Sequence, residues 1–568
     1  MTGSLTSRVA GEVPLPAAGD GSGHVETVHG SQPRVWISRH TADHVAAATA
    51  AAAGPLAGVT LGVKDNIDVA GFATTAGCPE FAYQPNASAD CAERLVAAGV
   101  VVVGKTNMDQ FATGLVGTRS PYGALSCVAD SRVVSGGSSS GSAVAVALGE
   151  CDVALGTDTA GSGRVPAALN GIFGLKPTRG LVSTVGVVPA CPSVDCVSVF
   201  ARTVRSARLA LMAMADPAGR RDSSRVGTPP FGPVLRPRVG VPRLLDVGTD
   251  LDGDARALFA AALAKLEHLG ASLHEIDFAP FDAAGDLLYG GPWVAERYAA
   301  VGEFIEGNPE AALDPTVREI ILGAASVSAV DTFRGMYELD GLLAAAQAAW
   351  AQVDVLALPT VGVAPTHEEV AADPHGANTR LGRYTRFVNL MDLCAISIPA
   401  GTRPGGVPFG LQLVAPAMAD AFICDLAERF EGAADTGPLR LAVAGAHLRG
   451  QPLNHQLVER GARFVAATRT APVYRLFRLA QSDPPKPGLV HDAAGAGAGI
   501  EVEVWELGPA EFGSFVAQVP PPLAIGTVSL EDGTEVSGFV CEPRALDGAT
   551  EITRFGGWRT ALGAQAGR

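Results

Sequence analysis

The chain has 568 residues, of which 47% are hydrophobic and 18% are charged, and its formal net charge is −16. A chain of this length exceeds one ordinary hydrophobic core, so two or more domains are expected. The acidic balance provides no basic surface of the kind that nucleic acids or anionic membranes require, which argues against both as partners.

Residues 1–32 are predicted to form a flexible N-terminal tail. They lack the basic start and apolar core of a signal peptide. The nine cysteines of the chain are scattered, and the close pair Cys191 and Cys196 lacks the further ligands that a zinc site needs. We therefore expect no metal, no cofactor, reduced thiols and a cytoplasmic location.

A first domain is expected over residues 33–433, because short apolar runs alternate there with longer helical patterns. This alternation predicts an α/β fold in which helices sandwich a mixed central sheet. The strand-like runs lie at 101–107, 151–158, 238–242, 353–360 and 395–401, and clear helical patterns at 254–270 and 420–433.

The pattern changes near residue 438, where strand-like segments begin to dominate. They lie at 440–448, 462–469, 499–507 and 523–543, and Asp532-Gly533 inside the last segment is a hairpin-turn signal. A second, smaller, β-rich α+β domain is therefore expected over residues 438–568.

Three segments of the first domain carry chemistry. Ser162 lies in a small-residue turn between an apolar strand and a helix, where backbone N–H groups can gather around an anion. A nucleophilic serine needs a base, yet no histidine occurs between His44 and His268. The group that activates Ser162 is therefore either something other than histidine or contributed from far along the chain.

Lys64 follows an apolar run and is one of five lysines in the chain. A lysine buried there would be costly unless it lost its proton, and it could then act as a base. The alternative is an ion pair with Asp65 or another carboxylate. A third segment, 135–149, is a Gly/Ser run whose hydroxyls could relay protons, although such runs are commonly plain loops.

Together the segments "GVKDNID", "GGSSSGSA" and "GTDTAGSGRVPA" resemble the signature blocks of the amidase signature family, in the same order and at similar spacing. The resemblance implies a Ser-Ser-Lys triad in which Lys64 is the base, Ser138 the relay and Ser162 the nucleophile. It also implies an oxyanion hole formed by the backbone N–H groups of Thr159, Ala160, Gly161 and Ser162.

Residues 287–304 resemble the substrate-binding segment of allophanate hydrolases, a branch of this family. The resemblance implies that Tyr289 and Arg297 hold the substrate carboxylate, which suits the bidentate geometry of a guanidinium group. The alternative for Arg297 is a surface arginine paired with Glu296 or Glu303.

Residues 443–454, 499–515, 521–542 and 552–562 resemble the extra C-terminal domain of the same branch, which is related in fold to γ-glutamylcyclotransferases. The resemblance implies a catalytic histidine there, and we favour His447 over His455. A satisfied structural histidine remains the alternative for each. Glu503 is a weaker candidate, because an alternating strand could simply expose it.

The predicted function is therefore hydrolysis of allophanate to ammonia and carbon dioxide, with the second domain assisting decarboxylation of N-carboxycarbamate. The expected partners are the small-molecule substrate, a second copy of the chain, and a separate allophanate-producing enzyme such as urea carboxylase or an enzyme of triazine or biuret breakdown. The alternatives are a general small-amide amidase, the glutaminase subunit of a tRNA-dependent amidotransferase, and a non-catalytic amidase-like scaffold.

Overall fold

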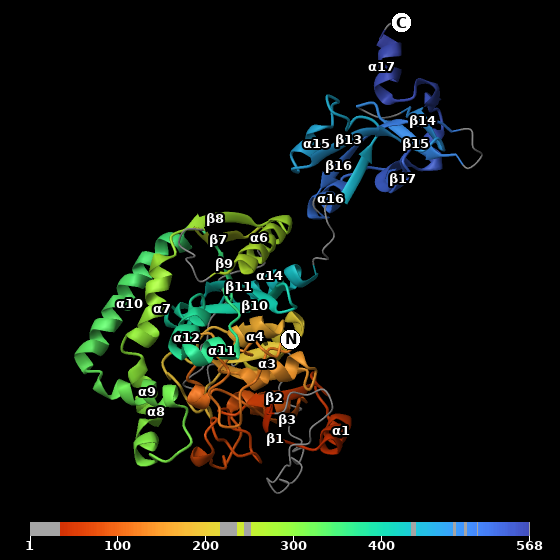
Figure 1. Cartoon of the computed structure of the whole chain (residues 1–568). Helices are drawn as coiled ribbons and strands as arrows, with labels where there is room; N and C mark the ends of the chain where they lie inside the picture. Colours follow the sequence, from red (N-terminus) through yellow and green to blue (C-terminus); the bar gives the residue numbers. More distant parts are fainter. Residues whose placement is uncertain are drawn as a thin grey trace, which may run out of the picture. The chain divides into compact units, whose positions relative to one another are not determined.

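The computed structural model describes residues 34–215, 236–243, 251–432, 439–480, 484–492, 497–507 and 509–566. The expected N-terminal tail lies outside these residues. The chain divides into two compact units, of which the larger ends at Gly432 and the smaller contains Ala433–Arg568. Both are drawn in Figure 1.

In the described part of the larger unit, eleven strands form one mixed sheet in the order β1-β3-β2-β4-β6-β5-β10-β11-β9-β7-β8. Neighbouring strands β2 and β4 are parallel, whereas β4 and β6 are antiparallel. The strands are β1 (Trp36–Arg39), β2 (Thr60–Lys64), β3 (Val101–Thr106), β4 (Val153–Asp158), β5 (Phe173–Lys176), β6 (Cys196–Ala201), β7 (Arg238–Pro242), β8 (Ser272–Ile276), β9 (Val355–Pro359), β10 (Leu393–Thr402) and β11 (Pro408–Pro416).

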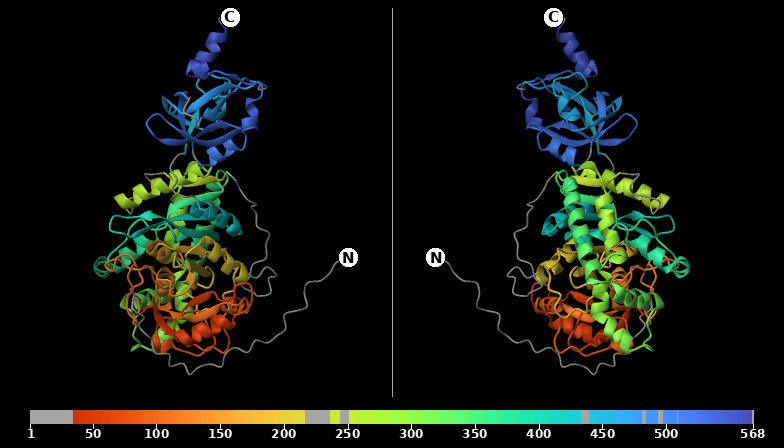
Figure 2. Two further views of the ribbon diagram at one scale, coloured as in Figure 1. Left: turned by 90° about the vertical axis from the view of Figure 1, so that its right-hand side faces the viewer. Right: turned by 90° about the vertical axis from the view of Figure 1, so that its left-hand side faces the viewer.

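Helices pack against this sheet in two groups, one built from α3 and α4 and the other from α2, α5 and α14. Figure 2 shows helices on either side of the strands, which confirms the predicted α/β sandwich. The helices are α1 (Ala42–Ala51), α2 (Asp90–Ala97), α3 (Ser140–Ala147), α4 (Val165–Asn170), α5 (Val204–Met214), α6 (Gly253–His268), α7 (Ala279–Gly290), α8 (Val294–Gly307), α9 (Pro315–Gly323), α10 (Ala329–Trp350), α11 (His367–Ala372), α12 (Pro374–Gly382), α13 (Phe387–Leu390) and α14 (Asp420–Gly432).

The five strand segments expected in this unit form β3, β4, β7, β9 and β10, and the two helical patterns form α6 and α14. Every residue of β4 and β6 is buried, because helices cover the central strands on both faces. Their near-continuous apolar sequence follows from this double burial.

The smaller unit is β-rich, as expected. A five-stranded sheet has the order β13-β16-β12-β18-β17, and a three-stranded sheet has the order β15-β14-β19. Gly533 has a φ of 83° in the turn of the predicted hairpin between β17 and β18. The elements are β12 (Leu439–Val443), α15 (His455–Val458), β13 (Arg463–Arg469), β14 (Tyr474–Arg478), β15 (Pro487–His491), β16 (Glu501–Leu507), α16 (Pro509–Val516), β17 (Leu523–Ser529), β18 (Glu535–Cys541), β19 (Thr550–Glu551) and α17 (Trp558–Ala566).

All nine cysteines are free thiols, and eight of them are buried. Within the described ranges, no cluster of three or more histidine, cysteine or acidic side chains could hold a metal ion. The helices of the same ranges include none that is both long and apolar enough to span a bilayer.

Candidate active site

The site lies where β2 and β4 end. These neighbouring strands are parallel, so their carboxyl ends meet at one edge of the sheet. Lys64 is the last residue of β2, and the turn that holds Ser162 follows β4 directly. Helix α3, which packs against both strands, begins two residues after Ser138. The three signature segments therefore meet at this edge.

Lys64 contacts Ser138 and not its sequence neighbour Asp65. Its Nζ lies 2.7 Å from Ser138 Oγ and 2.7 Å from Thr157 Oγ1. Asp65 instead pairs with Lys105, whose Nζ lies 3.3 Å from Asp65 Oδ1. The alternative of a Lys64–Asp65 ion pair is therefore wrong, because a second buried lysine neutralises that carboxylate.

The position of Lys64 favours its neutral form. Burial lowers its pKa from 10.5 to about 7, while the charges of Asp109, Asp195 and Asp158 oppose that shift and the charge of Arg297 adds to it. Desolvation prevails because the side chain has no exposed surface. A large fraction of the Lys64 side chains is thus neutral near pH 7 and can accept a proton.

Ser138 is held in a loop anchored by Asp109. The peptide bond between Gly137 and Ser138 is cis. Asp109 N–H donates to the Ser138 carbonyl at 3.0 Å, and its carboxylate accepts the N–H groups of Gly117 and Arg119. A Cβ on Gly137 would lie 2.2 Å from Asp109 Oδ2, so the loop requires glycine there.

The turn around Ser162 is fixed by a buried ion pair. Arg164 donates from Nε and NH2 to Asp158, both at 2.9 Å, and both side chains are fully buried. Asp158 also accepts the N–H groups of Gly161 and Gly163 at 2.9 Å. Burying this pair is tolerable because the remaining Arg164 donors reach Gln412, Asn389 and the Thr385 carbonyl.

Gly161 is required in this turn for two reasons. Its φ of 129° belongs to the region that favours glycine, and a Cβ there would lie 2.2 Å from Thr385 Oγ1. Thr385 Oγ1 donates to the Ala160 carbonyl at 2.7 Å. The turn therefore presents its N–H groups from a rigid backbone.

Of the four N–H groups expected to form an oxyanion hole, one is already occupied. Gly161 N–H donates to Asp158, whereas those of Thr159, Ala160 and Ser162 donate to no other residue in the described part of the chain. Within the same part, no hydrogen bond joins the Ser162 hydroxyl to Ser138. The structure thus brings Lys64 and Ser138 into contact and leaves three donors beside Ser162.

Arg297 is buried, with 1% of its surface exposed. It lies on α8, and its guanidinium carbon is 5.4 Å from the ring centre of Tyr289 on α7. NH1 donates to Thr113 Oγ1 at 3.0 Å, while Nε and NH2 are buried and have no partner among the described residues. The alternative of a surface arginine is therefore wrong.

Two unpaired guanidinium donors on one edge match the two oxygens of a carboxylate. The charge of Arg297 lowers the pKa of Lys64 and of Asp195, so the guanidinium lies near both groups. Glu296 was one of the two carboxylates considered as a partner of Arg297. It accepts hydrogen bonds from Ser193 instead.

Sequence reasoning missed the residues that support this site, namely Asp109, Asp158, Arg164, Asp195 and Thr385. Asp195 accepts from Thr159 Oγ1 at 2.5 Å and from the N–H groups of Ala190 and Cys191. Most of these partners lie tens of residues apart, and no local pattern links them. Asp158 and Arg164 lie within the signature segment and could have been paired from their spacing.

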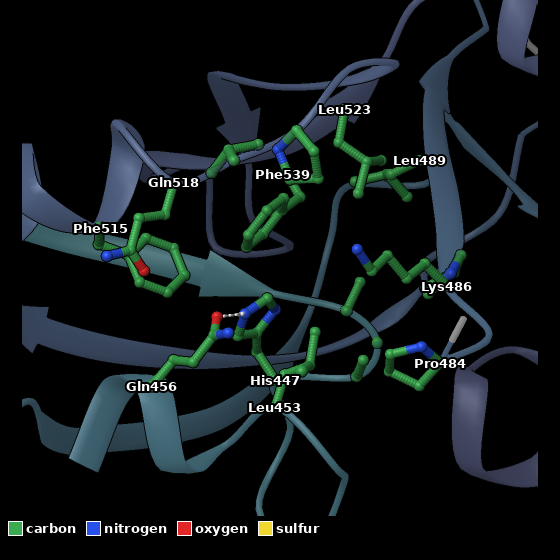
Figure 3. A pocket seen from close by; sticks show the side chains of 16 residues that line it. His447, Leu453, Gln456, Pro484, Lys486, Leu489, Phe515, Gln518, Leu523 and Phe539 are labelled. Carbon is green, nitrogen blue, oxygen red and sulfur yellow. Dashed lines mark hydrogen bonds between the residues drawn. The ribbon is translucent and has the colours of Figure 1, made fainter. Parts of the chain in front are cut away.

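In the smaller unit, His447 lines a cavity of about 220 Å³ (Figure 3). Its ring stacks on Phe539 with a centroid distance of 5.0 Å, and Nε2 lies 3.0 Å from Gln456 Oε1. Burial lowers the pKa of His447 below its usual range, and the charge of Lys486 adds to that effect.

The two other candidate catalytic residues of this unit, His455 and Glu503, have contacts typical of structural residues. His455 is exposed, and its Nδ1 lies 2.9 Å from the Pro452 carbonyl. Glu503 is buried, contrary to the expectation that its strand could expose it, and pairs with Arg449 and Arg559. These two arginines explain the burial of the charge.

Comparison with known proteins assigns both units. Residues 35–424 match the amidase family, and residues 439–563 match the allophanate hydrolase C-terminal domain. The chain is 43% identical over 541 residues to a urea amidolyase of Lachancea kluyveri, covering 89% of this chain but only 30% of that relative. The chain thus spans about a third of the length of the urea amidolyases that it matches.

Two shorter proteins are matched over most of their length. The solved structure of selenomethionine-substituted Kluyveromyces lactis allophanate hydrolase is 40% identical, with a TM-score of 0.67 and 93% of each chain covered. A glutamyl-tRNA(Gln) amidotransferase subunit from Natronomonas pharaonis is 37% identical, covering 65% of this chain and 94% of that relative. The chain therefore belongs to the amidase family of amidohydrolases and carries, after its amidase unit, the allophanate hydrolase C-terminal domain.

Proposed function

We propose that this chain hydrolyses allophanate, releasing ammonia and carbon dioxide. The observation that carries the proposal is Arg297, whose two unpaired buried donors lie in the same site as the Lys64–Ser138 pair. A buried cation with unpaired donors calls for an anionic ligand, and allophanate is a small amide that bears a carboxylate. The likeness to Kluyveromyces lactis allophanate hydrolase supports this choice of substrate.

In the proposed mechanism, neutral Lys64 takes the proton of Ser138 as Ser138 takes that of Ser162. The Ser162 oxygen then attacks the terminal amide carbon, and the developing oxyanion accepts from the N–H groups of Thr159, Ala160 and Ser162. Each such donor contributes roughly 3 kcal/mol to transition-state stabilisation. The C–N bond breaks as the relay returns its proton to the nitrogen, which leaves as ammonia.

Water then hydrolyses the acyl-enzyme and releases N-carboxycarbamate. Tyr289 and Arg297 hold the carboxylate through both steps in this proposal, so only an anionic amide is positioned correctly. The smaller unit assists the loss of carbon dioxide from N-carboxycarbamate, and His447 supplies the proton that the nitrogen takes up as its bond to the departing carboxylate carbon breaks.

The pH dependence follows from Lys64. Because burial lowers its pKa to about 7, the neutral base is present above that pH and is lost as the pH falls. We expect kcat/KM to fall about tenfold per unit below about pH 7. A profile measured from about pH 5 to about pH 9 checks this. A flat profile between about pH 6 and about pH 8 would contradict it.

Ammonia release from freshly prepared allophanate, with malonamide and biuret as comparisons, tests the proposed substrate. We expect allophanate to be preferred, without tRNA or a partner subunit. Equal turnover of malonamide would favour a general amidase, and a requirement for tRNA would favour an amidotransferase subunit. No turnover of any amide would favour the scaffold alternative.

The role of His447 can be separated from that of Ser162. We expect His447→Ala to keep release of the first ammonia and to delay carbon dioxide and the second ammonia, whereas His455→Ala should behave as the parent. A chain truncated near Gly437 should show the same delay. Time courses of both products measure it, and identical kinetics in all variants would remove the catalytic role of His447.

A homodimer is also proposed. Four large apolar side chains project from α10, with 48–68% of their surfaces exposed: Val330, Phe333, Met336 and Tyr337. A cluster of this kind favours contact with another protein surface. Light scattering should give twice the chain mass, and Phe333→Glu with Tyr337→Glu should give the monomer. A monomeric parent protein would refute the proposal.

The proposal also includes a separate enzyme that supplies allophanate and a cytoplasmic location for the protein. Allophanate would come from a urea carboxylase or from an enzyme of triazine or biuret breakdown, and the match to urea amidolyases supports the first source. The nine free thiols support a cytoplasmic location.

A further inference from the structure

Residues 382–389, which run from the end of α12 into α13, contact two parts of the active site. The first part is the turn that follows β4 and carries the proposed nucleophile. Thr385 Oγ1 donates to the Ala160 carbonyl at 2.7 Å, and Asn389 Nδ2 donates to the Asp158 carbonyl at 2.7 Å. All four of these residues are buried. Because the buried carbonyls have these side chains as partners, the 382–389 segment fixes the backbone of the turn.

The second part is helix α7, which carries Tyr289 in its last turn. Arg386 NH2 lies 2.9 Å from Asp286 Oδ1, and Arg383 NH2 lies 3.0 Å from Asp282 Oδ2. The two aspartates are four residues apart in the helix, so both arginines contact the same face of α7. Two ion pairs thus join the 382–389 segment to the helix of Tyr289.

The segment also packs closely on α7. A Cβ on Gly285 would lie 3.4 Å from Arg386 Cβ and 3.4 Å from the backbone nitrogen of Phe387. The Phe387 ring meets the rings of Phe278 and Phe281 edge-on, with centroid distances of 5.6 Å and 5.4 Å. Contacts of this kind favour one relative orientation of the rings. The position of α7 therefore depends on the same segment that fixes the turn.

We infer that the 382–389 segment sets the distance between the attacking oxygen of Ser162 and the side chain of Tyr289. Thr385 acts on the first of these groups and Arg386 on the second, so both are positioning residues. A fixed distance selects anionic amides by length, and in allophanate the carboxylate carbon lies two bonds from the attacked carbon. The choice of allophanate as the substrate rests on the proposed function.

Arg386→Met tests the contact of the segment with α7. Methionine keeps the apolar stem of the side chain and removes its charge, so the ion pair is lost while the packing remains. We expect KM for allophanate to rise about tenfold with kcat nearly unchanged, and turnover of uncharged malonamide to stay the same. Arg386→Lys should recover most of the parental KM. Arg380→Met is the matched control, since Arg380 pairs with Asp373 at the start of α12.

Thr385→Val tests the contact of the segment with the turn. Valine keeps the branched shape of threonine but cannot donate to the Ala160 carbonyl, so the turn loses a contact that fixes it. We expect kcat to fall about tenfold on allophanate and on malonamide alike, because the attack on either amide uses this turn. Thr385→Ser should remain close to the parent.

Succinamate tests the selection by length. Its carboxylate carbon lies three bonds from the amide carbon, so we expect the parent protein to hydrolyse it at least about tenfold less efficiently than allophanate. Arg386→Met should narrow this preference, since α7 is held less firmly. A parent protein that accepts both lengths equally would overturn the inference.

Hydrogen–deuterium exchange measures both contacts without a substrate. Arg386→Met should speed exchange at residues 287–290, and Thr385→Val should speed it at residues 159–163. Parental exchange rates in both variants, or parental kcat and KM on allophanate, would overturn the inference. An equal decline on allophanate and malonamide in Arg386→Met would also overturn it, because Arg386 would then support the whole fold. A parent protein that releases ammonia from malonamide but not from allophanate would refute the proposed function, and exchange would still decide whether the segment holds both parts.

Discussion

Replacing Ser162 with alanine is expected to lower ammonia release from allophanate by about 10⁴-fold or more, because the attacking oxygen is removed. Lys64→Ala should have an effect of the same order, since Ser138 and Thr157 provide no base in place of the amine. Ser138→Ala should lose most of the activity. Coupled ammonia assays of the purified variants measure these losses.

A matched substitution separates chemistry from folding. Lys64→Arg keeps a long cation but cannot supply a neutral base near pH 7, so it should be as inactive as Lys64→Ala. Each variant should keep a parent-like circular dichroism spectrum and cooperative unfolding. Near-parental activity in Ser162→Ala would disprove the assignment of the nucleophile.

Replacing Arg297 with alanine is expected to weaken transition-state binding of allophanate by on the order of 2 to 5 kcal/mol. This loss lowers kcat/KM for allophanate. The loss follows because the substrate carboxylate would enter a buried site without its cation. Slow hydrolysis of malonamide, which bears no charge, should change little. Steady-state kinetics on both substrates measure the difference.

Arg334→Ala is the control, because Arg334 on α10 keeps 76% of its side chain exposed. It should leave both substrates unaffected. A parallel decline of allophanate and malonamide turnover in Arg297→Ala would show that Arg297 supports the fold and does not select the substrate. Partial recovery in Arg297→Lys, which restores charge without the bidentate geometry, would further support selection by charge.

The resemblance of three short segments to the amidase signature blocks was sufficient to predict that Lys64 and Ser138 lie together, and the structure brings these two side chains into contact. The sequence was also sufficient for the mixed sheet, since runs such as 151–158 are long, apolar and bounded by small residues. Local sequence determines such features, and local patterns therefore predict them.

The partners of these residues could not be predicted in the same way. Whether Lys64 pairs with Asp65 depended on Lys105, which is delivered by the neighbouring strand β3. Arg297 has the same local sequence whether it is exposed or buried. Its burial is decided by the packing of α8 against distant segments, including the one that contains Thr113.

The cavity in the smaller unit could not be predicted from the sequence for the same reason. His447 and Lys486 are far apart in the chain and come together only when the strands and loops of this unit are assembled. A lone histidine and a lone lysine carry no recognisable spacing. The occupied N–H of Gly161 was also beyond prediction, because it depends on the rotamer of Asp158.

The most direct test of the central claim combines the nucleophile and the substrate in one measurement. The protein is treated with a serine-directed fluorophosphonate, and the site and rate of labelling are followed by peptide mass spectrometry with and without allophanate. We predict a single adduct on Ser162, formed more slowly when allophanate is present and unaffected by malonamide at the same concentration. Labelling at another residue, or labelling of Ser162 that allophanate does not slow, would contradict this prediction.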